Sequence, residues 1–386
     1  PETARRLADP LFTRDLFINQ YYIDQFVERR EQLLQEILQS LDADSRAALA
    51  LIYMRNGRLE SPVKLQLSET QALERLGSDL GRCILALEAL RGSLVLFSHA
   101  SGESAWQFKH PTIGDAYATL LMQSPEHLDI FIQGSAPDRL IDQVTCGDVG
   151  LEKAIVVPKS LFPPMLARLR EMLQSRSYKT AWLSTFGAKR DLQGFLANRC
   201  SKEFLSLYLK DNPDLLDQVS EPGLFLDTVP EVRLAKRLHQ FGLLPEEKRK
   251  KFVETVSTYA LDGQDGDALD DDGIQSLFTS EEFEELVHRV RTELLPRLDD
   301  VRHEWESNHS AGEPPDEHMQ QLLEFFSSVK ERFMDDEGTV KLIDRQIERT
   351  NEWIDENTPE EPERSPRKLG KIETPAESRS ARSIFD

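Results

Sequence analysis

One histidine has a residue type and a position that could do chemistry. His110 follows a short apolar-polar alternation, Trp106–Lys109, which is typical of the end of a strand. Pro111 comes next, at a first helical position where its missing N–H is no loss. The free N–H groups at the start of a helix attract anions, phosphates above all. We therefore predict that His110 stands beside a helix N-terminus that can meet a phosphate.

The residues after His110 predict that helix. Apolar side chains recur at the spacing of one face of an amphipathic helix, and we expect the helix to reach Met122. The residues on this face are Ile113, Ala116, Tyr117, Leu120 and Leu121.

The stretch before His110 predicts a winged helix, in which three helices precede a β-hairpin. The hairpin would cross a polar loop that contains glycine, and His110 would come directly off its second strand. The expected helices are Leu49–Met54, a helix opened by a Ser68-x-x-Gln71 capping box, and Asp79–Leu90, and the expected strands are Ser93–Phe97 and Ala105–Lys109.

A winged helix followed by F-x-H-x-x-[IV]-x-D-A resembles the "MHD" segment of STAND-type NTPases. Pro111 stands where the plant-type pattern has Asp. With that Pro, with RLADPLFTRDLF upstream and with RSIFD at the end, the chain resembles the bacterial novel STAND NTPases. The resemblance is specific over Arg6–Met122, weak over Ser124–Asn308, and returns at Arg382–Asp386. The matching residues are Phe108, His110, Ile113, Asp115 and Ala116.

This resemblance implies a function. In that family the histidine is thought to contact the β-phosphate of ADP and to hold the off state. It implies a nucleotide-sensing set of His110, Lys109, Thr112 and Asp115 within 21–123, the linker helix and winged helix. It also implies that residues 1–20 form the exit from an upstream P-loop ATPase domain. Because the chain starts at Pro1 and not at Met, we interpret it as a fragment, which agrees with this expectation. The full-length protein would bind ATP or ADP with Mg²⁺, whereas this chain alone would bind no cofactor.

Two local alternatives stay open. A neutral His110 could simply cap its helix and tie it to the wing, without any ligand. The winged helix could instead bind DNA, with Asp79–Leu90 as the recognition helix. That helix carries Arg82 but also the acidic Asp79 and Glu88. The wing carries Lys109 and His99 but also the acidic Glu103. DNA-binding proteins normally present clustered Lys and Arg, so this charge pattern does not favour DNA binding.

Composition limits the class of protein. The chain has 386 residues, enough for two or three domains, and no apolar run near the ~20 residues that a membrane span needs. Of its charged residues, 34 acidic and 15 basic ones lie in 261–386, so this part carries most of the net charge of −21 and repels nucleic acid. Cys83, Cys146 and Cys200 have no metal or disulfide spacing, and we expect a cytoplasmic protein.

Residues 124–310 predict an irregular helical region that is similar to helical repeats but has no fixed period. Caps or prolines mark helix starts at Ser124-Pro125, Ser135-Ala-Pro137 and Asn212-Pro213, and we expect loops at Gly223 and Pro230. Ala154–Val157 suits a short strand or a helix end. Asp262–Gly273 fails the spacing of a calcium-binding EF-hand in both registers, so we interpret it as a solvated acidic loop.

The C-terminal part predicts further helices. Thr279-x-x-Glu282 is a capping box, and Pro296 should kink or end the helix that follows it. Residues 311–357 predict a helical hairpin or short coiled coil. Residues 358–386 are rich in Pro, Glu, Ser, Lys and Arg and should be a disordered tail, because they bury too little apolar surface to offset their ordering entropy.

No catalytic motif is present in the sequence. G-x-x-x-x-G-K-[ST], G-x-S-x-G and H-E-x-x-H are all missing, so we expect no catalytic residue and no metal ligand. The chain is therefore predicted to be mainly α, and the resemblance implies that it is the regulatory half of a STAND-type signalling NTPase of the kind used in bacterial antiphage defence. Its partners would be the ATPase domain, further copies and a protein or phage trigger, with no membrane. A DNA-binding regulator is the alternative, and a helical scaffold without a nucleotide role is the third.

Overall fold

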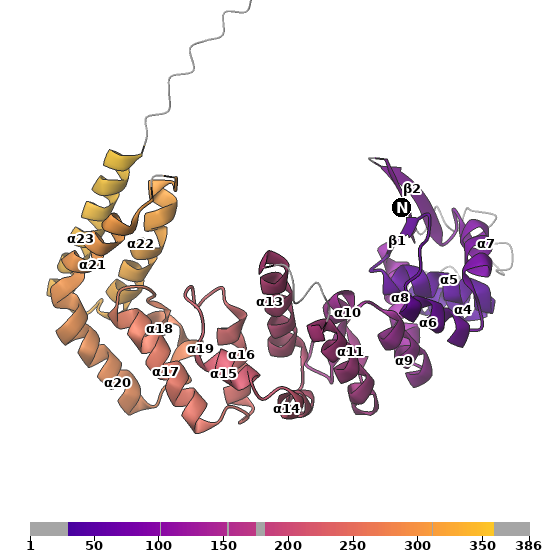
Figure 1. The fold of residues 1–386 in the computed structure, drawn as a ribbon, viewed down its shortest axis with the longest axis horizontal. Helices are drawn as coiled ribbons and strands as arrows, with labels where there is room; N and C mark the ends of the chain where they lie inside the picture. Colours follow the sequence, from indigo (N-terminus) through magenta and orange to yellow (C-terminus); the bar gives the residue numbers. More distant parts are fainter. Residues whose placement is uncertain (1–29, 101, 153, 175–181, 311, 359–386) are drawn as a thin grey trace, which may run out of the picture. The chain divides into compact units, whose positions relative to one another are not determined.

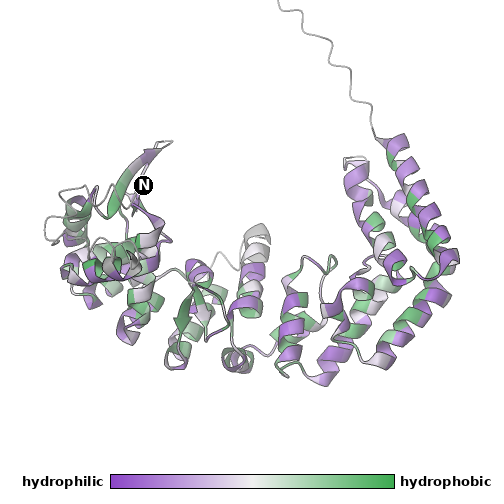
Figure 2. Ribbon diagram, turned by 180° about the vertical axis from the view of Figure 1, so that it is seen from behind, coloured by the Kyte–Doolittle hydropathy of each residue, from purple (hydrophilic) through white to green (hydrophobic). Residues whose placement is uncertain are grey.

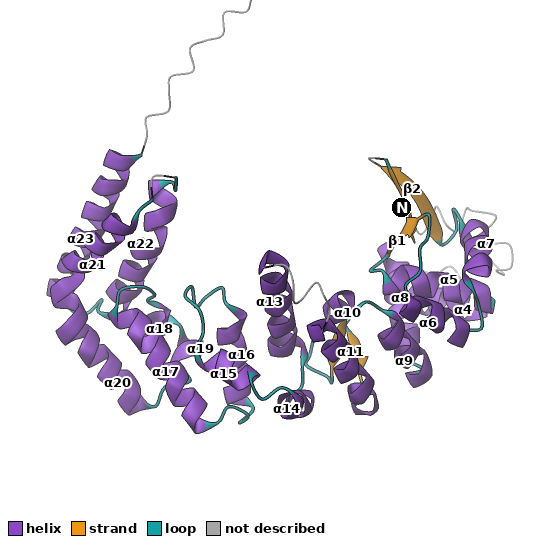
Figure 3. Ribbon diagram, viewed as in Figure 1, coloured by secondary structure: helices purple, strands orange, loops and turns teal. Residues whose placement is uncertain are grey.

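The fold was obtained as a computed structural model, which describes residues 30–358 apart from 101, 153, 175–181 and 311. These residues are mainly helical and include two small sheets, which confirms the predicted fold class (Figure 3). The chain divides into two compact units, Pro1–Arg297 and Leu298–Asp386. The expected exit segment 1–20, the first part of the expected linker helix, and all of the expected tail except Thr358 lie outside the described residues.

The first unit begins with the elements of a winged helix (Figure 1). A linker helix precedes them and packs against the helix that follows the wing. The elements are α4 (Arg30–Ser40), α5 (Ala43–Met54), β1 (Arg58–Ser61), α6 (Leu67–Arg75), α7 (Leu80–Leu90), β2 (Val95–Ala100), β3 (Glu103–Phe108) and α8 (Pro111–Met122).

The wing contains a strand that local patterns do not predict. β1 pairs antiparallel with β3, and β3 pairs antiparallel with β2, so the strand that comes last in the chain lies in the middle. Leu59 on β1 and Phe97 on β2 both lie opposite Trp106 on β3. Leu59 is fully buried, and the Phe97 and Trp106 rings lie 4.6 Å apart between centroids. This small apolar seam holds the sheet together.

Capping residues begin the helices of the winged helix. The Asp42 carboxylate accepts the Ser45 N–H at 2.8 Å, and the Asp79 carboxylate accepts the Arg82 N–H at 3.0 Å. The Ser68 capping box was placed wrongly, because α6 starts at Leu67, before that serine. The capping carboxylate is Glu69, which accepts the Gln66 N–H at 2.7 Å. Glu69 also binds the guanidinium of Arg55, at the end of α5, and this contact favours a start of α6 before Ser68.

The rest of the first unit is a succession of short helices. α13 packs against α10 and α16, and α15 packs against α16 and α17. The elements are α9 (Pro125–Gly134), α10 (Pro137–Gln143), β4 (Val144–Cys146), β5 (Ile155–Val157), η1 (Lys159–Leu161), α11 (Phe162–Gln174), α13 (Trp182–Arg199), α14 (Lys202–Asp211), α15 (Leu215–Ser220), α16 (Pro230–Gln240), α17 (Glu246–Leu261), α18 (Asp267–Asp270), α19 (Asp272–Gln275), α20 (Ser280–Arg289), η2 (Val290–Leu294) and η3 (Leu295–Arg297).

Several expected features of this region are confirmed, whereas the interpretation of Pro230 as part of a loop is wrong. Ser124 caps α9 by accepting the His127 N–H at 3.3 Å, and Thr279 caps α20. Ile155–Val157 is a strand that pairs parallel with β4. Pro296 lies in the 3₁₀ turn Leu295–Arg297, which follows the π-helical stretch Val290–Leu294 and directly precedes Leu298, so the regular α-helix is interrupted around this proline. Pro230 is the first residue of α16 and not part of a loop, because proline is pre-organised for a first helical turn.

The acidic segment Asp262–Gly273 is not a solvated loop. It holds two short helices, and Asp265 is 5% exposed. The Asp265 carboxylate accepts backbone N–H groups of Leu226 at 2.9 Å and of Asp267 at 3.0 Å. These bonds compensate the burial of the carboxylate and tie the segment to the loop before α16.

The second unit contains α21 (Leu298–Asn308), α22 (Pro315–Arg332) and α23 (Glu337–Asn357). Its core is apolar, with Phe325, Phe326 and Ile343 almost fully buried. Hydrophilic residues lie along the outer sides of these helices (Figure 2). The Arg302 guanidinium is also buried and binds Gln346 of α23 at 3.2 Å, which links the first and third helices.

Candidate functional site

The predicted histidine lies at the junction of β3 and α8. His110 is the N-cap of α8, with extended backbone angles, and Pro111 occupies the first turn. Its Nδ1 accepts the Thr112 N–H at 3.2 Å and lies 2.9 Å from the Thr112 hydroxyl. The Ile113 N–H donates to the His110 carbonyl at 3.0 Å. The imidazole therefore caps its own helix.

This geometry corrects the expectation of free N–H groups at the terminus. Pro111 has no N–H, and the Thr112 and Ile113 N–H groups both have acceptors within His110. Because Nδ1 accepts, the proton of a neutral ring is on Nε2. Nε2 makes no hydrogen bond to any part of the chain that the structure describes. Any anion at this terminus would therefore meet an Nε2–H donor and not a nest of backbone amides.

The other residues of the expected sensing set have different surroundings. Thr112 is held against the His110 ring, as described. The Lys109 ammonium donates to the Gly92 carbonyl, and the Lys109 N–H donates to the Leu94 carbonyl at 2.9 Å. Lys109 thus fastens the end of β3 to the turn before β2. Its charge is directed toward the base of the wing.

Asp115 lies one turn further along α8, on the wall of a cavity of about 530 Å³. Tyr53 of α5 and Arg199 of α13 line the same cavity, and neither was predicted from the sequence. Burial, and then the nearby Asp115 carboxylate, raises the pKa of Tyr53 to about 12. Tyr53 sits in an ordinary apolar helix, so nothing local in the sequence marks it as a neighbour of Asp115.

An aromatic cluster fixes the orientation of α8. The Tyr53 ring lies 5.3 Å from that of Tyr117 and 5.5 Å from that of Phe131, measured between centroids. Burial raises the pKa of Tyr117 well above its ordinary value. Ile113, on the same face of α8, is fully buried. Since α8 is held by α5 and α9, the position of His110 follows from the packing of the whole winged helix.

The winged helix lacks the charge pattern of a DNA-binding protein. The Arg82 guanidinium, on α7, pairs with Asp79 at 2.8 Å and lies 3.6 Å from Asp44. Leu85 on the same helix is 72% exposed. On the wing, His99 hydrogen-bonds Ser104 at 2.8 Å. An exposed leucine and a neutralised arginine are a poor match for a phosphate backbone.

Within the described ranges, no group of three or more His, Cys, Asp or Glu side chains is arranged to hold a metal ion. Cys83, Cys146 and Cys200 are buried free thiols. None of the helices described is both long and apolar enough to cross a membrane.

The site therefore consists of one oriented imidazole at a strand-to-helix junction, with a threonine beneath it and an aspartate on a neighbouring cavity. A single N–H donor of this kind fits a hydrogen bond to a phosphate oxygen, but these residues do not by themselves enclose a nucleotide. Comparison of the chain with protein-family models, with curated proteins and with solved structures finds no match.

Proposed function

We propose that this chain is the regulatory part of a STAND-type signalling NTPase and that His110 senses the nucleotide held by a P-loop domain outside residues 1–386. The main support is the geometry of His110. Nδ1 is used as a helix cap, which orients the ring and leaves Nε2–H to donate to a phosphate oxygen. The winged helix with its MHD-like segment is the second support, and such switches would serve signal responses such as antiphage defence.

His110 would act as a latch. The hydrogen bond to ADP forms only while the winged helix lies against the nucleotide domain, so it favours the closed state. A hydrogen bond to a charged group contributes about 1.5–3 kcal/mol. Its loss would shift the equilibrium toward the open state by about tenfold or more. The P-loop domain would bind and hydrolyse the nucleotide. This chain would supply the oriented imidazole of His110 and its Nε2–H donor.

The test uses the protein that contains both the P-loop domain and this chain. The release of a fluorescent ADP analogue is measured by stopped flow for the wild type, His110→Ala and His110→Asn. Asparagine is a good N-cap, so it keeps the helix cap and removes the Nε2–H donor. We expect both variants to release ADP about tenfold faster.

Ser124→Ala is the matched control, because Ser124 caps the next helix, α9, and has no place in the sensing set. It should lower stability by about 1 kcal/mol and leave ADP release unchanged. If His110→Asn retains ADP as well as the wild type does, His110 is only a helix cap and the proposal is wrong.

A further inference from the structure

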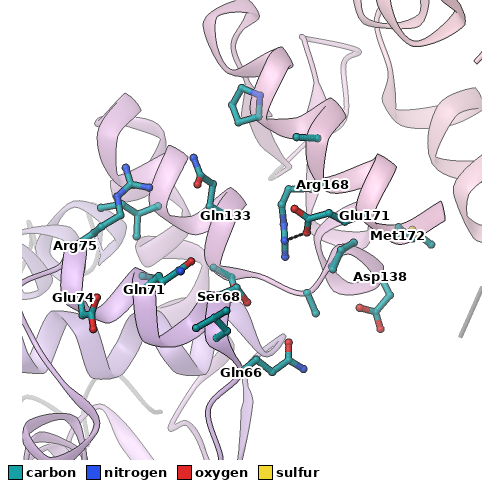
Figure 4. A pocket seen from close by; sticks show the side chains of 18 of the residues that line it. Gln66, Ser68, Gln71, Glu74, Arg75, Gln133, Asp138, Arg168, Glu171 and Met172 are labelled. Atoms are coloured by element: carbon teal, nitrogen blue, oxygen red, sulfur yellow. Dashed lines mark hydrogen bonds and ion pairs between the residues drawn. The ribbon is translucent and has the colours of Figure 1, made fainter. Parts of the chain in front are cut away.

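A groove runs between the winged helix and the helices that follow it, within the first unit. Its volume is about 1270 Å³, which exceeds the roughly 300–1,000 Å³ of most small-molecule sites. α6 and α9 form one wall and α11 forms the other (Figure 4). Figure 4 shows Gln71, Arg75 and Gln133 on the first wall and Arg168 and Glu171 on the second. A ligand that filled this space would be larger than a typical metabolite.

The walls of this groove are tied to each other. α6 and α9 lie so close that a Cβ added at Gly134 would come within 2.8 Å of the Ala72 Cβ. Ser68 donates to the Gly134 carbonyl at 3.3 Å. Arg168, on the opposite wall, donates to the Ser135 carbonyl. The groove is thus a preformed feature of the packing.

Carboxylates dominate the charge of the groove. Arg75 pairs with Asp129 at 2.7 Å, and Arg168 pairs with Glu171, so both guanidinium groups are neutralised. Three further lining carboxylates, all exposed, have no ion-pair partner within the described part of the chain. These carboxylates are Glu74, Asp138 and Asp191.

Two carboxylates of the groove also act on a carboxyl group that lies outside it. Burial, and then the charge of Asp191, raises the pKa of Asp142, which lines the cavity beside Asp115. Arg199 lowers this pKa, and Asp138 raises it further. Asp138 and Asp191 therefore act on the same region, from α10 and from α13. A cationic ligand would relieve this repulsion.

The groove also offers groups that suit a polypeptide backbone. Gln66, Gln71 and Gln133 line it, and each side-chain amide can both donate and accept. Leu67, 75% exposed, adds an apolar contact at the edge.

We propose that this groove binds an extended, lysine- or arginine-rich segment of a partner protein. Asp138, Asp191 and Glu74 would pair with its basic side chains, while the glutamine amides would bind its backbone. The inference is independent of His110 and of nucleotide sensing, because it uses a different surface and needs no nucleotide.

The test measures fluorescence anisotropy with the 386-residue chain at low salt. The probe is a fluorescein-labelled nonapeptide with the repeat lysine–leucine–serine, and its counterpart has glutamate in place of lysine. We expect the lysine peptide to bind at least about tenfold more tightly, and its affinity to fall as salt screens the carboxylates. Asp138→Asn with Asp191→Asn should weaken it about fivefold.

Two variants separate occupancy of the groove from general attraction to an acidic protein. Ala167→Tyr fills the groove without a change of charge and should abolish binding, with thermal unfolding measured to confirm the fold. Asp214→Asn with Glu254→Gln removes two exposed charges elsewhere in the first unit and should leave binding unchanged. Equal affinity for both peptides, undiminished binding by a folded Ala167→Tyr protein, or no binding of the lysine peptide at millimolar concentration would each overturn the proposal.

Discussion

Arg249→Met should destabilise the first unit by about 3 kcal/mol, because it removes the centre of a buried network. Arg249 is 4% exposed. Its guanidinium binds Glu246 of α17 at 2.6 and 2.8 Å and Glu282 of α20 at 2.6 and 2.8 Å. It also donates to the Leu277 carbonyl at 2.6 Å.

The magnitude depends on which partners remain buried. Glu282 is only 26% exposed, so removal of the guanidinium leaves its carboxylate largely buried without a positive partner. The Leu277 carbonyl also loses its hydrogen-bond donor. Glu246 is 63% exposed and can return to water. Glu246→Gln should therefore cost at most about 1 kcal/mol and serves as the matched control.

The network also predicts a pH dependence. The Arg249 guanidinium lowers the pKa of Glu282 from 4.5 to about 2. A depressed carboxyl pKa stabilises the folded state above the unfolded pKa, and this contribution is lost as pH falls from about 4.5 toward 2. The difference in free energy of unfolding between the wild type and Arg249→Met should thus be constant above pH ~5 and shrink below it.

Urea unfolding at pH 7, 4 and 3, followed by circular dichroism, measures this difference. A loss below about 1 kcal/mol at pH 7, or a difference that does not change down to pH 3, would show that the network is solvated and that the reasoning is wrong.

Three further predictions concern the winged helix and the acidic segment. In the isolated chain, His110→Ala should lower stability by about 1 kcal/mol, and His110→Asn should lower it by much less, because asparagine can replace the Nδ1 acceptor; thermal unfolding measures both. Asp267 has a pKa raised to about 7, by burial and then by Asp265, so its contribution to stability falls as pH rises from about 3.8 through 7. Asp267→Asn should therefore raise the melting temperature at pH 8 more than at pH 4, and equal shifts would refute this. Gly134→Ala should cost about 1–3 kcal/mol in urea unfolding, since its methyl group would meet Ala72, and a neutral result would show that α6 and α9 can separate.

Local signals predicted the features that neighbouring residues determine. His110-Pro111, Ser124-Pro125 and the Thr279 capping box each begin a helix where the sequence indicates, because a cap and its N–H donor are only a few residues apart. The start of α6 was missed because Glu69 also binds Arg55, fourteen residues earlier. Capping rules contain no information about such a partner.

Features that depend on distant partners were not predictable. Arg58–Ser61 has one buried apolar residue, Leu59, and becomes a strand because β3 lies beside it. Asp265 looks like a solvated acid, and its burial depends on the distant Leu226 N–H as well as on the nearby Asp267 N–H. The same holds at the candidate site. The place of His110 follows from its own neighbours, whereas the cavity that Asp115 shares with Tyr53 and Arg199 requires the fold.

The strand order of the wing constrains how the domain can form during synthesis. β3 lies between β1 and β2 but is made last, so β1 has no partner in this sheet until Phe108 has left the ribosome. The residues of α5, α6 and α7 have been synthesised by then, while the sheet is still incomplete. The loop that joins β1 to β3 must close before their pairing stabilises anything, which slows this step. α8 begins at Pro111, three residues after the end of β3. The winged helix therefore closes at the end of its own synthesis, and a nascent chain stopped before Glu103 exposes β1 as an unpaired edge open to chaperones or to other nascent chains.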